Sequence, residues 1–144
     1  MKNIKGYSLV FSQFFFILII LLPLGTPTSN FFLALLLIIL GAIVGILALY
    51  ANRFFNIHPA IKENASLVTS GVYAYIRHPM YTAVLTMMFG IVLLYPMAYV
   101  FVSYALLVGT LLVKLFYEES LWKAQSDEYL IYMKSTKRLV PFIF

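Results

Sequence analysis

FFLALLLIILGAIVGILALY, residues 31–50, is a run of twenty residues that contains no charged side chain. A helix that crosses the hydrocarbon core of a bilayer needs about 20 predominantly apolar residues. The whole chain is 63% hydrophobic and only 10% charged, whereas soluble domains carry roughly 25% charged residues. We therefore expect an integral membrane protein. Its 144 residues predict a single domain, 1–144.

Three further apolar segments cover residues 8–24, 80–95 and 97–113. A cleaved signal peptide is the alternative for the first, but no small-residue cleavage pattern follows it. Pro96 separates the last two segments without a polar loop, which predicts a tight helical hairpin, because the combined run is too long for one span. The mixed polar and apolar tail, 116–140, is typical of amphipathic helices at a membrane surface. The expected fold is all-α, with about four transmembrane helices and a C-terminal amphipathic interfacial helix.

The net charge of +5 follows a topological pattern. The two loops expected on one side, 25–30 and the turn at Pro96, carry no charge, so every basic residue falls on the other side. The positive-inside rule then places both termini, the segment 51–79 and any active site at the cytoplasmic face. The basic residues are thus explained by topology and anionic lipid, and nucleic acid is not expected as a partner. Cysteine is absent, which excludes disulfides and thiol chemistry.

Gly41 and Gly45 form a GxxxG pattern in the second apolar segment. Small residues at this spacing let another helix approach closely. Packing within the helical bundle is the first interpretation, and a dimer interface or close approach of a ligand is the alternative.

LVTSGVYAYIRHPMY, residues 67–81, concentrates polar and aromatic residues between apolar runs. Pro79 disfavours helical angles at His78 and is itself suited to open the third helix. Arg77 and His78 would then lie at a helix N-terminus, which attracts a carboxylate or a phosphate. The alternative is an ordinary juxtamembrane Arg beside a helix-opening Pro.

Several other residues are candidates for ligand binding or catalysis. Glu118 follows Lys114 by four residues and shares its helix face, so the pair is either a solvated ion pair or part of a headgroup-level pocket. Tyr73 and Tyr81 offer aromatic faces that attract cations, while Tyr75 is expected to anchor the interface. His58 is either a ligand contact or a solvated loop residue. We predict no metal site.

These motifs together resemble the isoprenylcysteine carboxyl methyltransferase family and the related phospholipid N-methyltransferases. The resemblance covers residues 52–142 and consists of the RHPMY element, a helical hairpin, Glu118-Glu119, DEYLIY and a terminal KRLVP. It implies an integral membrane methyltransferase that takes S-adenosylmethionine and acts on a lipophilic small molecule or lipidated substrate. The cofactor-binding positions that it implies are His58, Leu67, Val68, Tyr73, His78, Pro79, Met80, Tyr81 and Glu118.

Lys114 is the one departure from the pattern, since the eukaryotic carboxyl methyltransferases carry an Arg there. Lys lacks the planar fork that grips a carboxylate in two places. We expect Lys114 to orient an anionic acceptor, with His78 and Glu118 as the further catalytic candidates. A carboxylate acceptor is the first prediction and a phosphatidylethanolamine-type amine the alternative.

Two alternative functions, each from a different class of protein, stay open. A non-enzymatic membrane protein would be expected to carry polar residues along a path through its spans, and the most polar there are Gln13, Ser103 and Thr110. A reductase with a related helical layout would bind a nicotinamide cofactor near the same boundary.

Overall fold

The computed structural model describes residues 4–22, 24–28, 30–52 and 67–144. This part of the chain holds five α-helices and one 3₁₀ helix, without a β-strand. The elements are α1 (Ile4–Ile20), α2 (Phe31–Ala51), η1 (Gly71–Ala74), α3 (Pro79–Leu94), α4 (Ala98–Gln125) and α5 (Asp127–Ser135). The all-α prediction is confirmed for the described residues.

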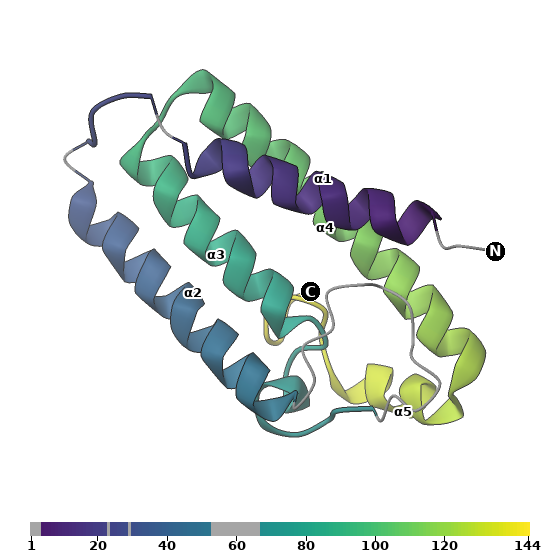
Figure 1. Cartoon of the computed structure of the whole chain (residues 1–144). Helices are drawn as coiled ribbons and strands as arrows, with labels where there is room; N and C mark the ends of the chain where they lie inside the picture. Colours follow the sequence, from purple (N-terminus) through teal and green to yellow (C-terminus); the bar gives the residue numbers. More distant parts are fainter. Residues whose placement is uncertain (1–3, 23, 29, 53–66) are drawn as a thin grey trace.

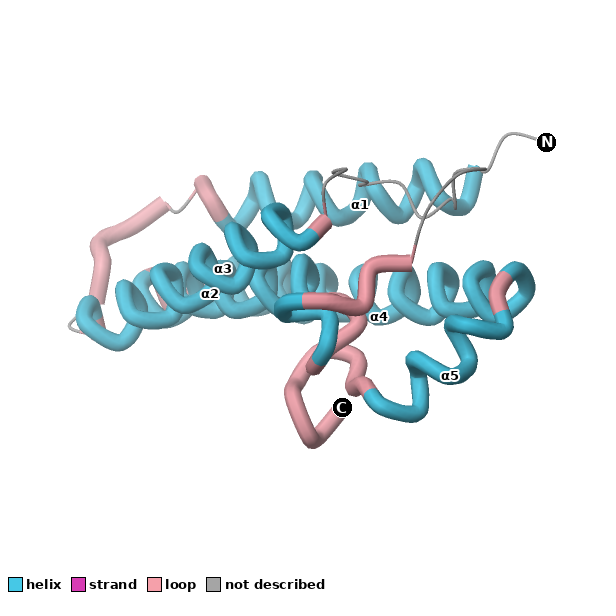
Figure 2. Tube along the Cα trace, turned by 90° about the horizontal axis from the view of Figure 1, so that it is seen from below, coloured by secondary structure: helices cyan, strands magenta, loops and turns pink. Residues whose placement is uncertain are grey.

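Four helices form a bundle in which α2 packs along α3 and α1 packs along α4 (Figure 1). α3 also contacts α1 and α4 and so joins the two pairs. Leu107 and Leu111 of α4 and Val92 of α3 belong to the core between them. Figure 2 shows α5 outside this bundle, next to the end of α4.

Two of the helices, α2 and α4, are long and apolar enough to cross a membrane, whereas the apolar helices α1 and α3 have 17 and 16 residues and are shorter. α2 exposes large apolar side chains such as Phe32 and Ile46 over most of its surface. An apolar outer surface of this extent is expected of a helix surrounded by lipid. Of the four predicted spans, two are therefore long and apolar enough to cross a membrane, and the other two stay a prediction.

The helix ends differ from the prediction in two places. α1 begins at Ile4, before the expected residue 8, and ends at Ile20. α4 continues beyond residue 113 to Gln125, since residues 114–125 contain neither Pro nor Gly and bury Leu115 and Glu119 on the same helix face as Leu111. The tail 116–140 is thus shared between the last turns of α4 and the short helix α5. Ser126 caps α5 by accepting a hydrogen bond from the Tyr129 amide.

The hairpin at Pro96 is confirmed. α3 ends at Leu94, and α4 starts at Ala98, with the Met97 carbonyl accepting from Val100 and Phe101. On the same end of the bundle the Thr28 amide donates to the Leu94 carbonyl. The uncharged loops therefore meet at one end, and the RHPMY element lies at the other.

Gly41 and Gly90 let α2 and α3 approach closely. A Cβ placed on Gly90 would lie 2.7 Å from the Ala34 carbonyl oxygen, and one on Gly41 would lie 2.8 Å from that of Ala83. Both neighbours are helix backbone, which has no room to yield. Packing within the bundle therefore explains the first glycine of the GxxxG pattern.

We expect Gly90→Ala to lower the free energy of unfolding by about 1–3 kcal/mol, as overpacking of a close contact does. Gly109→Ala on α4 is the matched control, because a Cβ there meets no atom within 4 Å and helix propensity favours Ala by about 1 kcal/mol. Thermal unfolding of both variants in detergent micelles checks this. Equal stability of the two variants would contradict the close packing of α2 on α3.

Candidate functional site

The RHPMY element is fixed by the C-terminal segment of the chain. The Arg77 amide donates to the Lys137 carbonyl at 2.7 Å, and the His78 amide donates to the Arg138 carbonyl at 3.0 Å. The Lys137 amide returns a hydrogen bond of 3.1 Å to the Tyr75 carbonyl, which completes a short parallel pairing. Next to this pairing, His78 has φ −123° and ψ 56°, outside the α-helical region that a following proline disfavours.

Arg77 is buried in an ionic network. Its Nε lies 2.9 Å from Glu119 Oε1, and Nη1 donates to the Thr136 carbonyl. Arg138 Nε lies 3.2 Å from the other oxygen of Glu119. Two guanidinium groups therefore satisfy one buried carboxylate. The sequence left two interpretations of Arg77 open, an anion site at the mouth of α3 and an ordinary juxtamembrane arginine, and neither included this internal pairing with Glu119.

His78, Tyr81 and Glu118 form the candidate site. The Tyr81 hydroxyl donates to Glu118 Oε1 at 2.6 Å. The His78 and Tyr81 rings stack at 5.3 Å, and His78 Nδ1 lies 3.7 Å from Glu118 Oε2. Oε1 thus accepts from tyrosine, while Oε2 lies near the His78 ring and accepts no hydrogen bond from the described residues.

The second imidazole nitrogen of His78 is buried and has no hydrogen-bond partner among the described residues. It lies 3.6 Å from Glu119 Oε1, which is longer than a normal hydrogen bond. A buried polar atom without a partner is uncommon in folded proteins and calls for an explanation. Glu119 is within ion-pairing distance of this nitrogen and accounts for its burial.

Lys114 does not form the ion pair with Glu118 that was one of the two interpretations of this spacing. Its Nζ donates to Gln13 Oε1 of α1 at 2.9 Å and lies 5.2 Å from the centre of the Tyr81 ring. The residue is 2% exposed. In the sequence Gln13 is a polar residue within an apolar run, and no spacing rule predicts its contact with Lys114.

α5 supports the site from outside the bundle. The Tyr132 hydroxyl donates to the Tyr73 carbonyl at 2.6 Å, which ties α5 to η1. Burial raises the pKa of Tyr132 to about 12, so this hydroxyl keeps its proton at physiological pH. Burial also raises the pKa of Tyr73, a hydrogen bond with Asn52 opposes the shift, and the Glu118 charge adds to it. Tyr73 is therefore close enough to Glu118 to sense its charge.

The predicted site residues divide into three groups. The described contacts bring His78, Tyr81 and Glu118 together, with Lys114 behind the Tyr81 ring and Tyr73 nearby. Pro79 is buried as the first residue of α3 and Met80 is half-buried beside it. Leu67 and Val68 are half-buried in the segment before η1, and their assignment stays a prediction. His58 lies outside the described residues.

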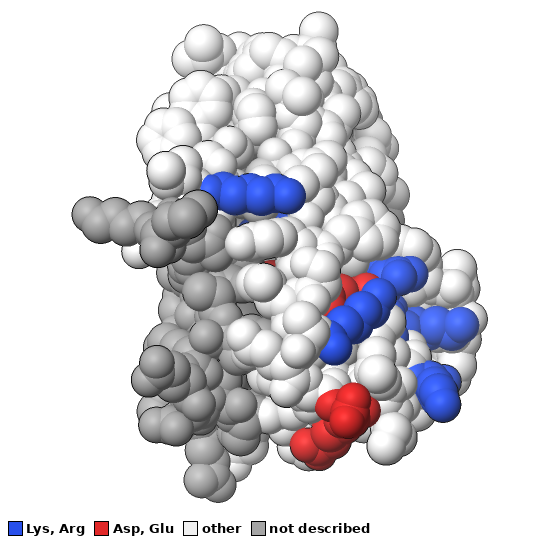
Figure 3. Space-filling model, turned by 90° about the vertical axis from the view of Figure 1, so that its right-hand side faces the viewer, with Lys and Arg blue, Asp and Glu red and all other residues white. Residues whose placement is uncertain are grey.

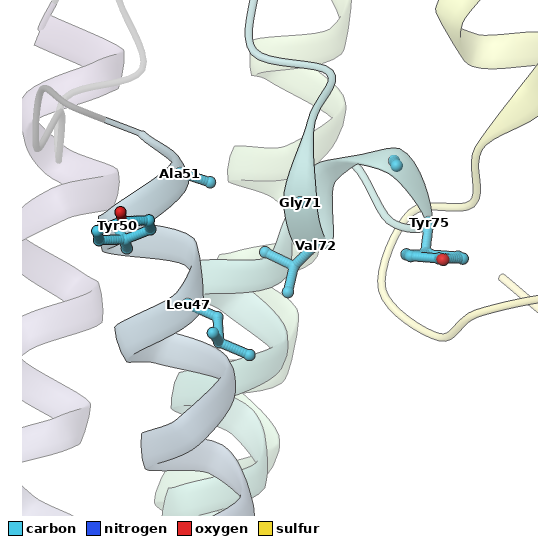
Figure 4. Close-up of a pocket in the computed structure, with 7 residues that line it drawn as sticks. Leu47, Tyr50, Ala51, Gly71, Val72 and Tyr75 are labelled. Carbon is cyan, nitrogen blue, oxygen red and sulfur yellow. The ribbon is translucent and has the colours of Figure 1, made fainter.

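An apolar groove of about 490 Å³ lies between the end of α2 and η1. Figure 4 shows Leu47 and Ala51 of α2 facing Val72 of η1 across it, with Tyr75 at one end. Gly71 starts η1 at a φ of 62°, a conformation that glycine adopts without cost. The groove adjoins the site through Val72 and its neighbour Tyr73.

The charged side chains gather at the end of the molecule that holds this site. Figure 3 shows most of them in the lower half of the view, around the end of α4 and α5. Lys5, near the start of α1, also reaches this end, where its Nζ lies 4.9 Å from the Tyr117 ring centre. The described part of the chain thus has one charged end and one uncharged end, as the sequence predicts.

The fold and the site define a class: a helical membrane protein with an acidic and aromatic site at the charged end of its bundle. The family model for phospholipid methyltransferases matches residues 29–125, more than half of the chain. The chain belongs to the phospholipid methyltransferase family, and this identifies it as a membrane methyltransferase. The methyltransferases of this family use S-adenosylmethionine. A comparison with curated proteins gave no match.

Proposed function

We propose that this protein transfers a methyl group from S-adenosylmethionine to the amine headgroup of a membrane lipid, at the end of the bundle where α3 begins. The observation that carries the proposal is the Tyr81–Glu118 hydrogen bond of 2.6 Å beside the stacked His78 ring. It combines a carboxylate with aromatic faces, and both attract a cation. The cofactor and a lipid amine are both cationic.

The residues present fit the cofactor. Glu118, whose side chain is 19% exposed, and the His78 ring would hold its amino or ribose groups, with Tyr81 and Tyr73 beside the positive sulfur. When bound, S-adenosylmethionine supplies a methyl group that is attached to a positively charged sulfur. The leaving group is then a neutral thioether. Pro79, Met80, Leu67 and Val68 are the further positions that we propose for this pocket.

The acceptor is an amine rather than a carboxylate for an electrostatic reason. The cation beside Tyr81 is the Lys114 ammonium, which is 2% exposed and is turned toward Gln13 of α1, so it is poorly placed for an anionic acceptor. Glu118 Oε2, which accepts no hydrogen bond from the described residues, would repel a carboxylate and attract an ammonium. Carboxyl methylation stays the second candidate, because Lys114 is nevertheless the cation that lies against Tyr81.

The chain's own groups have three tasks in this reaction. Glu118 binds the lipid ammonium and takes one proton on Oε2, which frees the nitrogen lone pair that forms the new bond to carbon. The Tyr81 hydroxyl donates to Oε1 and so fixes the direction of the carboxylate. His78 packs against Tyr81 and excludes water from it. Alignment of two bound reactants contributes up to roughly 7–11 kcal/mol in favourable systems.

Cofactor binding by the full chain in lipid nanodiscs tests the proposal. We expect calorimetric titration with S-adenosylhomocysteine to show binding and titration with NADPH to show none. Labelled methyl groups should then appear in phosphatidylethanolamine supplied in the disc rather than in a prenylcysteine analogue. Binding of NADPH alone would favour the reductase, and label only in the prenylcysteine would favour the carboxyl acceptor.

The apolar groove is the side on which we expect the lipid chain to lie. We expect Val72→Trp, which fills the groove, to raise KM for the lipid about tenfold and to leave the affinity for S-adenosylhomocysteine unchanged, because Val72 lines the groove and not the polar site. Val102→Trp, on an exposed face of α4, is the control. Equal KM values for the two variants would show that the lipid takes another path.

We further propose that the charged end of the bundle faces the cytoplasm, as the positive-inside rule predicts. The cofactor would then reach the site from water, and the lipid would reach it from the adjoining leaflet. Labelling of single cysteines at Ser120 and Thr28 in intact cells distinguishes the two orientations, since the chain has no cysteine of its own.

A further inference from the structure

The contact between Gln13 and Lys114 joins two helices far apart in the sequence. Gln13 lies near the middle of α1 and is 7% exposed, and Lys114 of α4 is 2% exposed. Among the described residues, the ammonium donates one hydrogen bond, to the amide oxygen of Gln13 at 2.9 Å. Burying an ammonium between apolar helices is costly, and such residues in membrane proteins usually serve function.

Lys114 is also in contact with the site. Its ammonium lies 5.2 Å from the centre of the Tyr81 ring, within the range of about 6 Å in which a cation is attracted to an aromatic face. The hydroxyl of the same ring donates to Glu118. A continuous line of contacts therefore runs from Gln13 through Lys114 and Tyr81 to the carboxylate.

We propose that Gln13 is a positioning residue of the active site, which holds the Lys114 ammonium against Tyr81 and so sets the direction in which Tyr81 presents Glu118. The inference rests on the proposed function, and it makes α1 a part of the active site. α1 lies outside residues 29–125, the part that the family model matches. Lys114 is thereby reassigned from holding an acceptor to positioning Tyr81.

A purely structural role of the pair makes a different prediction. Replacing both members of a buried polar pair by apolar residues of similar size is often neutral or stabilising. If Gln13 and Lys114 only join α1 to α4, the double variant Gln13→Met/Lys114→Met should regain full function. If they position Tyr81, the double variant should be stable and still impaired.

The test compares the wild type, Gln13→Met, Gln13→Glu and the double methionine variant in nanodiscs. Thr110→Val is the control, because its hydroxyl donates only within α4, to Leu106. We expect the double variant to unfold at or above the wild-type temperature but to lose about ten- to a hundredfold in kcat, the scale of a small misplacement of catalytic groups. Gln13→Glu keeps an acceptor for the ammonium and should retain most of the rate.

The outcomes separate this inference from the function on which it rests. A stable double variant with wild-type kcat and wild-type affinity for S-adenosylhomocysteine overturns the positioning role alone. Loss of rate in Gln13→Glu as large as in Gln13→Met also overturns it. A wild-type protein that binds no S-adenosylhomocysteine overturns the proposed function, and the positioning role with it.

Discussion

Glu118→Gln is expected to lower methyl transfer to a lipid amine by about 10²- to 10⁴-fold, the range that a positioned acid or base contributes. The amide keeps the size of the side chain and still accepts the hydrogen bond from Tyr81, which is 2.6 Å away in the wild type. It cannot take a proton from an ammonium, and it carries no charge to attract a cation. Radiolabel counting in extracted lipid measures the rate.

The companion measurements make this prediction specific. Glu128→Gln, in the exposed first turn of α5, is the matched control and should keep the wild-type rate. The affinity of Glu118→Gln for S-adenosylhomocysteine should fall as well, because the same carboxylate is proposed to bind the cofactor. A Glu118→Gln protein with full transfer would remove the carboxylate from the mechanism.

Arg77→Met is expected to be the most destabilising single change in the described part of the chain. Removing one partner of a buried ion pair costs about 3–5 kcal/mol, because the other charge is left without compensation. Here Glu119 would keep Arg138 and the more distant His78 ring, and the Thr136 carbonyl would lose its donor. Thermal unfolding in detergent micelles should therefore show a lower midpoint.

Two further variants define the cause of that loss. Lys123→Met, on the exposed last turn of α4, removes a positive charge without a buried partner and should unfold like the wild type. Arg77→Lys keeps the charge but lacks the planar fork that reaches Glu119 and Thr136 together, so we expect an intermediate midpoint. An Arg77→Met protein as stable as Lys123→Met would contradict a structural role of the network.

The site was predictable to the extent that it depends on helix geometry. Pro79 opens α3 and places Tyr81 in its first turn, and α4 carries Glu118 one turn beyond Lys114. These positions follow from local backbone rules and from the spacing of a helix. The role of Glu119 did not follow, because it depends on which side chains the C-terminal segment brings to it.

The sequence by itself determined that this is a helical membrane protein, where its helices turn, and that its charges gather at one end. These properties depend on apolar length, on Pro96 and Pro79, and on charge order along the chain, all of which are local. Only the tertiary structure decided that Arg77 is used internally and that Gln13 holds Lys114. Gln13 and Lys114 are 101 positions apart, and Arg77 and Thr136 are 59 apart. Contacts at such separations are selected by helix packing and by the energetic cost of leaving a buried charge unpaired.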